Sequence, residues 1–281
     1  MNSGYTKVSD IVFGRAGDYE LLLDLYLPKA PIRTVPIIIY IHGGGWSGLD
    51  KTWCPYAMRM LNQEYAVATI NYRLSHQAPF PAQLYDCKAA VRWLRAHASE
   101  YHLDGAHIGA WGDSAGGHLS AMLGVTGCHS ETEGESGTPG VSSVVQAVCD
   151  WYGPSDLEHL GIPPSQLDWQ DDNSWLAQFI GGAPARNIEK LRAASPVTYA
   201  SKDAAPFLIM HGDHYTSVAL SQSIYLYGAL WMAGADVDLY VVHGGDHLSY
   251  DHRTTDIPWL APEVNQLVDA FFYRTLKCTR N

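Results

Sequence analysis

The chain has 281 residues, 47% of them hydrophobic and 17% charged, a composition typical of a globular protein rather than a disordered one. This length suits a single α/β domain, residues 1–281, that folds without disulfides or metals. The formal net charge of −11 repels phosphate backbones and anionic lipids, so it argues against binding to nucleic acid or to a membrane.

The N-terminal residues and the cysteines bear on the cellular compartment. Residues 1–19 contain no basic stretch followed by an apolar one, and no apolar run reaches the roughly 18 residues of a membrane span. Five cysteines at scattered spacings predict reduced, mostly buried thiols rather than disulfides or a zinc site. We therefore expect a cytoplasmic protein, or a secreted one if a signal peptide has been removed.

Strands and helices alternate along the chain. Strand-like runs occupy residues 10–27, and the nearly continuous apolar runs 35–41 and 65–70 indicate strands buried on both faces. Further strands are expected at 108–111, 144–148, 207–210 and 237–242, and helices at 52–63, 81–97, 114–125, 218–232 and 258–276. This alternation predicts a mostly parallel sheet with helices on both faces.

Two segments interrupt the alternation. Residues 130–140 are rich in Glu, Gly, Ser and Thr, which predicts a flexible surface loop. Residues 155–195 carry proline pairs together with Trp169, Trp175 and Phe179. We expect this second segment to form a small cap over the sheet edge where the strands end, although a plain surface excursion is the alternative.

The strongest chemical motif is the run from Gly112 to Gly116, which reads Gly-Asp-Ser-Ala-Gly. It follows a predicted strand and opens a predicted helix, the context that a nucleophile elbow requires. Small residues two positions before and after Ser114 permit the sharp turn, and the helix N-terminus favours developing negative charge. We predict Ser114 as a catalytic nucleophile; a structural glycine turn is the alternative.

A second motif, His42-Gly-Gly-Gly-Trp46, comes directly after the strand at 35–41. Acyl transfer builds negative charge on a carbonyl oxygen, and backbone N–H groups stabilise it, each contributing about 3 kcal/mol. We expect the N–H groups of Gly44, Gly45 and Ala115 to form this oxyanion hole. His42 is expected to brace the loop rather than to catalyse.

The general base is expected after the last strand, in the run Gly244-Gly-Asp-His247. We predict His247 for this role, because His243 lies at the end of the strand and is expected to be packed. Aromatic residues Trp46, Trp151, Tyr152 and Trp169 are candidates for lining the substrate pocket, with core or cap packing as the alternative.

These motifs together resemble the hormone-sensitive-lipase-like and acetyl-xylan/feruloyl-esterase-like branch of α/β-hydrolases. The resemblance covers nearly the whole chain and also uses the runs 71–74, 78–82 and 207–213. It implies the α/β-hydrolase fold and an esterase that acts on small acetylated or aromatic esters without a cofactor.

The sequence departs from this family at the triad acid. The family has Asp two residues after His-Gly-Asp, where this chain has Tyr215, and Ala219 replaces a nearby proline. Three explanations stay open: Asp213 supplies the acid, Asp246 or Asp150 does so, or the triad is incomplete. An acid holds the histidine tautomer and stabilises the imidazolium, so its loss costs several orders of magnitude in rate.

The predicted function is therefore carboxylic ester hydrolysis through an acyl-enzyme. An amidase or peptidase with the same residues is one alternative, and an impaired, ligand-binding homologue resembling the plant gibberellin receptors is another. A metal hydrolase is a further alternative, for which the available ligands would be His211, Asp213, His214, Asp246 and His247. No metal-binding helix motif supports it, and we expect no metal and no cofactor. The sequence does not predict an oligomeric state.

Overall fold

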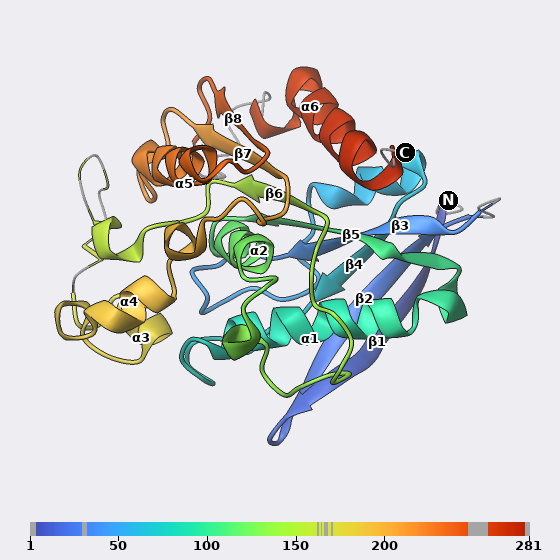
Figure 1. Ribbon diagram of the computed structural model, residues 1–281, viewed down its shortest axis with the longest axis horizontal. Coiled ribbons are helices and arrows are strands. Elements are labelled where there is room, and N and C mark those ends of the chain that lie inside the picture. The colour runs from blue at the N-terminus through green and yellow to red at the C-terminus, as the bar shows by residue number, and fades with distance from the viewer. Residues whose placement is uncertain are drawn as a thin grey trace.

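The computed structural model describes residues 4–29, 33–161, 163, 165, 168–169, 171–246 and 258–278. Eight strands form one sheet in the order β1-β2-β4-β3-β5-β6-β7-β8 (Figure 1). The strands are β1 (Tyr5–Ala16), β2 (Tyr19–Pro28), β3 (Val35–Ile41), β4 (Ala66–Ile70), β5 (Leu103–Asp113), β6 (Ala147–Trp151), β7 (Phe207–Gly212) and β8 (Val237–Val242). β1, β2 and β4 pair antiparallel, and every other neighbouring pair is parallel.

Helices cover both faces of this sheet. The α-helices are α1 (Ala82–Ala96), α2 (Ala115–Val125), α3 (Trp175–Ile180), α4 (Ile188–Ala193), α5 (Leu220–Ala233) and α6 (Pro262–Phe272). Figure 1 shows α1 and α6 on opposite sides of the strands, and shows α3 and α4 together at the end of the molecule away from both termini. The predicted α/β architecture with a mostly parallel sheet is confirmed.

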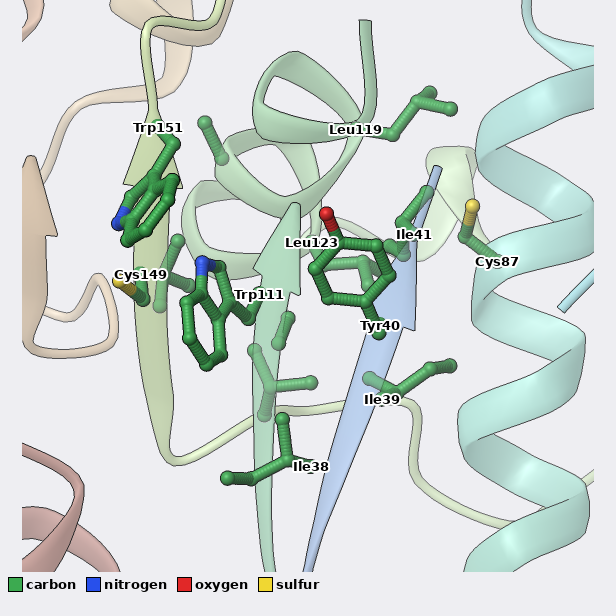
Figure 2. Close-up of a cluster of buried hydrophobic side chains, with 14 of the residues drawn as sticks. Ile38, Ile39, Tyr40, Ile41, Cys87, Trp111, Leu119, Leu123, Cys149 and Trp151 are labelled. Atoms are coloured by element: carbon green, nitrogen blue, oxygen red, sulfur yellow. The ribbon is translucent and has the colours of Figure 1, made fainter. Parts of the chain in front are cut away.

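The core follows from the apolar runs of the central strands. β3 is buried along its whole length, as are β4 and β6. Figure 2 shows Trp111 of β5 beside Trp151 of β6, with their ring centroids 5.2 Å apart, and Tyr40 of β3 nearby. Such dense packing of large rings around the strand ends gives the loops beyond them a rigid base.

Several predicted elements have different bounds. The helix expected at 52–63 is a 3₁₀ helix over Ala57–Gln63 only, because Pro55 disfavours helical geometry in the residue before it. β6 lies three residues later than expected, and β5 starts earlier and ends later than the predicted strand at 108–111. The closing helix expected at 258–276 is divided into a 3₁₀ turn, α6 and a terminal π-helical turn.

The segment at 130–140 is not a loosely attached surface loop. Glu133 binds two cations of α1, with oxygen-to-nitrogen distances of 2.8 Å to Lys88 and 2.8 Å to Arg92. Lys88 is fully buried and also donates to the Thr132 hydroxyl at 2.9 Å. A buried ammonium needs such partners, so the acidic loop satisfies α1 and is held against it.

Candidate active site

Ser114 lies at the turn between β5 and α2, with φ of 54° and ψ of −120°. This region is disfavoured for a residue with a Cβ, and the surrounding backbone holds the turn in place. The Ser114 N–H donates to the Trp151 carbonyl at 2.9 Å. A Cβ on Gly112 would lie 2.3 Å from the Gly116 backbone, and one on Gly116 would lie 1.9 Å from the Ile41 carbonyl oxygen. Glycine is therefore required at both positions, as the motif predicted.

The glycine loop after β3 faces this turn. Gly44 and Gly45 have φ of 91° and 58°, and a Cβ on Gly44 would lie 2.4 Å from the Gly48 carbonyl oxygen. Among the described residues, no group accepts a hydrogen bond from the N–H of Gly44 or Gly45. Ala115 is the first residue of α2, so its N–H has no partner within the helix. The amides predicted for the oxyanion hole are thus available for an added ligand.

A cavity of about 480 Å³ joins these groups. Ser114 lies on its wall with the three predicted oxyanion residues, and most of the remaining wall is apolar. The other lining residues are Trp46, Ser47, Gly48, Leu49, Trp53, Asp113, Pro154, Trp169, Trp175, Tyr215, Ser217 and Val218. Such a cavity is suited to a small, largely apolar ligand with one polar group to orient.

The predicted aromatic residues are distributed between cavity and core. Trp46 and Trp169 line the cavity, whereas Trp151 and Tyr152 are fully buried and are not among the lining residues. Trp175, which like Trp169 comes from the segment between β6 and β7, also lines it. The Trp175 side chain is 51% exposed, and a Cβ on Gly45 would lie 3.0 Å from its ring. Trp175 therefore covers the oxyanion loop from the side of the expected cap.

His118 fixes the orientation of Trp46. The Trp46 indole N–H donates to His118 Nδ1 at 3.1 Å, and His118 Nε2 donates to the Ala194 carbonyl at 2.7 Å. Burial lowers the pKa of His118 to about 4, so the ring is neutral at physiological pH. No sequence motif identified His118, although it follows Ser114 by one helical turn and therefore lies on the same face of α2.

Asp113, the residue before the nucleophile, links three parts of the site. Its carboxylate accepts a hydrogen bond from the Tyr40 hydroxyl of β3 at 2.6 Å, and the Trp53 indole and the Gly43 N–H lower its pKa. Burial raises the pKa of Asp113 to about 6, although these donors oppose the shift. The carboxylate therefore ties the elbow to the oxyanion loop and to the cavity wall. The sequence analysis did not single it out.

Tyr215 occupies the position expected for the triad acid. It is buried and lines the same cavity as Ser114. Burial raises the pKa of Tyr215, and the Ser114 contact partly offsets that effect.

Asp213 interacts with residues at the end of β8. Its two oxygens accept His243 Nδ1 at 2.9 Å and the Gly244 N–H at 2.8 Å. These two contacts lower the pKa of Asp213. The expectation that His243 is packed was wrong, since its side chain is 87% exposed and is held by this carboxylate. His247, the predicted base, lies outside the described residues, so its distance to Asp213 is not defined.

The two other candidate acids differ in their surroundings. Asp150 is buried, accepts the Gly153 N–H at 3.0 Å and is not among the cavity-lining residues. Burial raises the pKa of Asp150 to about 7. Asp246 is exposed, and its charge is close enough to raise the pKa of Tyr215. Of these two carboxylates, Asp246 is therefore the one whose charge affects the cavity wall.

Neither a metal site nor a membrane-spanning helix is found in the described part of the chain. No three His, Cys, Asp or Glu side chains there are placed to hold a metal ion. No helix in those ranges is long and apolar enough to cross a membrane.

Comparison with known proteins gives consistent matches. The sequence profile of the BD-FAE family matches residues 23–230. Esterase LipQ of Mycobacterium tuberculosis is 29% identical over 254 residues, which are 89% of this chain and 58% of LipQ. Carboxylesterase NlhH of the same species is 35% identical over 186 residues, 63% of this chain and 54% of NlhH. The chain spans about half the length of these curated relatives.

Solved structures agree in fold. A truncated carbohydrate esterase from gut microbiota has a TM-score of 0.87 and 30% identity, covering 99% of both chains. Thermogutta terrifontis esterase 2, in a form phosphoramylated by tabun, has a TM-score of 0.77 and 22% identity, covering 97% of this chain and 95% of that one. The fold is therefore that of the α/β-hydrolase esterases.

Proposed function

The chain belongs to the BD-FAE family, and we propose that it hydrolyses carboxylic esters through a serine acyl-enzyme. The observation that carries the proposal is the position of Ser114, which projects from a strained turn into an apolar cavity beside the amides of Gly44, Gly45 and Ala115. That arrangement matches what acyl transfer needs, a nucleophile next to donors for the carbonyl oxygen.

In the proposed reaction, Ser114 Oγ attacks the ester carbonyl and gives its proton to His247. The carbonyl oxygen then accepts hydrogen bonds from the N–H groups of the oxyanion loop and of Ala115. The alcohol leaves with the proton from His247, and water repeats the sequence on the acyl-enzyme. Asp213 is the proposed orienting acid. No metal or cofactor takes part in these steps.

The proposed substrates are small acetyl or aromatic esters. The wall formed by Trp46, Trp53, Trp169 and Trp175 supports this assignment, because aromatic rings bind apolar groups and sugar faces alike. Relatives named as carboxylesterase and carbohydrate esterase are consistent with it. We also propose that residues 155–195 act as a cap, since Trp169 and Trp175 come from this segment.

Initial hydrolysis of p-nitrophenyl acetate by the parent and by Ser114→Ala tests the function. We expect the mutant to lose about 10⁴-fold or more in kcat, because removing the nucleophile leaves only the oxyanion hole and binding. Equal rates in the two proteins would refute the role of Ser114. Comparing p-nitrophenyl acetate with p-nitroacetanilide distinguishes an esterase from an amidase.

The residue at position 215 gives a specific reason to consider an impaired homologue that binds small molecules. Tyr215 cannot orient a histidine as a carboxylate does. If the parent shows no turnover and Tyr215→Asp gains a large rate, the parent lacks its acid and the esterase proposal fails for this chain. If the parent turns over, another carboxylate supplies the acid.

The proposed location is the cytoplasm. All five cysteines are free thiols, and two of them, Cys87 and Cys149, are buried. Free thiols persist in a reducing compartment. Recovery of the native protein in the periplasmic or culture fraction, rather than with cytoplasmic markers, would contradict this location.

A further inference from the structure

Three buried rings connect the oxyanion loop to the helix that follows Ser114 and to the segment between β6 and β7. Trp46 comes directly after the oxyanion glycines, His118 lies in α2 and Phe179 lies in α3. The Trp46 ring stacks on Phe179 with their centroids 4.2 Å apart. Both rings meet His118 nearly at right angles, with centroid distances of 5.2 Å and 5.5 Å. Packing of this kind fixes the orientation of each ring, so the three segments are held together.

The two hydrogen bonds of His118 require one tautomer of its ring. An indole N–H only donates and a carbonyl oxygen only accepts. Nδ1 therefore accepts from Trp46 at 3.1 Å, and Nε2 carries the proton that it donates to the Ala194 carbonyl at 2.7 Å. Ala194 caps the C-terminus of α4, where the last carbonyl groups lack partners within the helix. His118 thus joins a side chain of the oxyanion loop to a backbone group of the segment between β6 and β7.

The backbone of the oxyanion loop explains why Trp46 needs this anchor. Gly44, Gly45 and Trp46 have φ of 91°, 58° and 57°, so three successive residues lie in the left-handed region. Glycine adopts this region without strain, whereas a residue with a bulky side chain does so only where its surroundings hold it. Trp46 is the one residue of the three with a side chain. Neighbouring elements can therefore hold the loop in place through the Trp46 ring.

We propose that His118 is a positioning residue, through which the segment between β6 and β7 holds Trp46 and the oxyanion loop in the geometry that ester hydrolysis requires. The inference rests on the proposed function. His118 takes no part in proton transfer. It keeps the N–H groups of Gly44 and Gly45 directed at the position that the carbonyl oxygen takes in the transition state. A donor displaced by about 1 Å stabilises that oxygen poorly, so the rate falls while substrate binding changes little.

The first test is His118→Leu, which removes both hydrogen bonds and keeps an apolar side chain in the buried position. We expect kcat for p-nitrophenyl acetate to fall about tenfold to a hundredfold, with KM changed by less than about twofold. Inhibition by a trifluoromethyl ketone should weaken by a similar factor, because its adduct with Ser114 places an oxyanion at the same position. A role in stability alone would lower the midpoint of unfolding and leave kcat of the folded protein at the parent value. That result would overturn the proposal.

Two conservative variants separate the two hydrogen bonds and keep the test valid if His118→Leu does not fold. His118→Asn places an amide oxygen where Nδ1 accepts from Trp46, but it is too short to reach Ala194. His118→Gln places an amide N–H where Nε2 donates to Ala194, but it leaves the Trp46 N–H without its acceptor. We expect each variant to lower kcat at least about threefold, because the loop is held only when both bonds are present. A parent value of kcat in either variant would overturn the proposal.

The matched control is His97→Leu. His97 also stacks on a tryptophan, with its centroid 4.3 Å from that of Trp93, and its Nδ1 contacts the Trp93 carbonyl at 2.9 Å. Neither residue is among those that line the cavity, so kcat and the ketone inhibition should stay at the parent values. A loss of kcat as large as that of His118→Leu would overturn the proposal. A parent protein that neither hydrolyses the ester nor binds the ketone would instead contradict the proposed function itself.

Discussion

The buried carboxyl of Asp150 makes the stability of the protein depend on pH. Asp150 lies in β6, and one oxygen accepts the Gly153 N–H at 3.0 Å. The other oxygen has no hydrogen-bond partner among the described residues. A charge in this position is poorly compensated, and burial accordingly raises the pKa of Asp150 from 3.8 to about 7. We expect Asp150→Asn to stabilise the protein at alkaline pH relative to acidic pH.

The size of the effect follows from proton linkage. The folded state holds the Asp150 proton more tightly than the unfolded state, so stability falls as the pH rises from 3.8 to about 7 and is constant above that. At about 1.4 kcal/mol per pKa unit, ionisation of the folded protein costs about 4 kcal/mol above pH 7 and about 2 kcal/mol at pH 5. The advantage of Asp150→Asn over the parent should therefore be about 2–3 kcal/mol larger at pH 8 than at pH 5.

Urea unfolding of both proteins at pH 5 and pH 8 measures this difference. Asparagine keeps an acceptor for the Gly153 N–H, so the difference between the two pH values isolates the charge. Asp18→Asn, in the exposed turn between β1 and β2, is the control and should show no such difference. An advantage that is the same at both pH values would refute the reasoning. Hydrolysis should stay within about threefold of the parent, and a hundredfold loss would make Asp150 the triad acid.

Three further substitutions test the site. Asp213→Asn should lower kcat for p-nitrophenyl acetate at least about a hundredfold, and an unchanged rate would exclude it as the acid. Trp175→Ala should raise KM about tenfold for aromatic esters but change KM little for acetate esters, because it removes one wall of the cavity. The control Trp231→Ala, on the exposed face of α5, should change neither KM value. His118→Phe should lower the free energy of unfolding by about 1–3 kcal/mol in urea titrations, since the buried Trp46 N–H loses its acceptor.

Sequence patterns predicted the elements that a continuous apolar run defines. β3 was predicted with its observed bounds because its sequence is such a run. β8 was also predicted with its observed bounds, because its apolar residues, interrupted only by Asp238, lie between turn residues. β6 was displaced because it contains Asp150, a polar residue that the sequence pattern excludes from a buried strand. The bond from the Gly153 N–H makes that carboxyl tolerable there, and it forms only in the folded chain.

The residues of the candidate site also differ in whether a local sequence pattern reveals them. Ser114, Gly44 and Gly45 line one cavity, and they could be singled out because each belongs to a short contiguous motif whose chemistry depends on local backbone geometry. The links from Asp113 to Tyr40 and Trp53 join separate segments of the chain, so no local spacing reveals them.

The choice of carboxylate for the triad acid depends on the free energy that each would lose on binding a catalytic histidine. Asp213 is paired with His243, whose side chain is 87% exposed, and an exposed pair contributes at most about 1 kcal/mol. Asp213 would therefore lose little free energy by exchanging His243 for a histidine in the site. Neither carboxylate lines the cavity, but Asp150 would in addition have to ionise in the core. This comparison of costs supports the proposal that Asp213 is the acid.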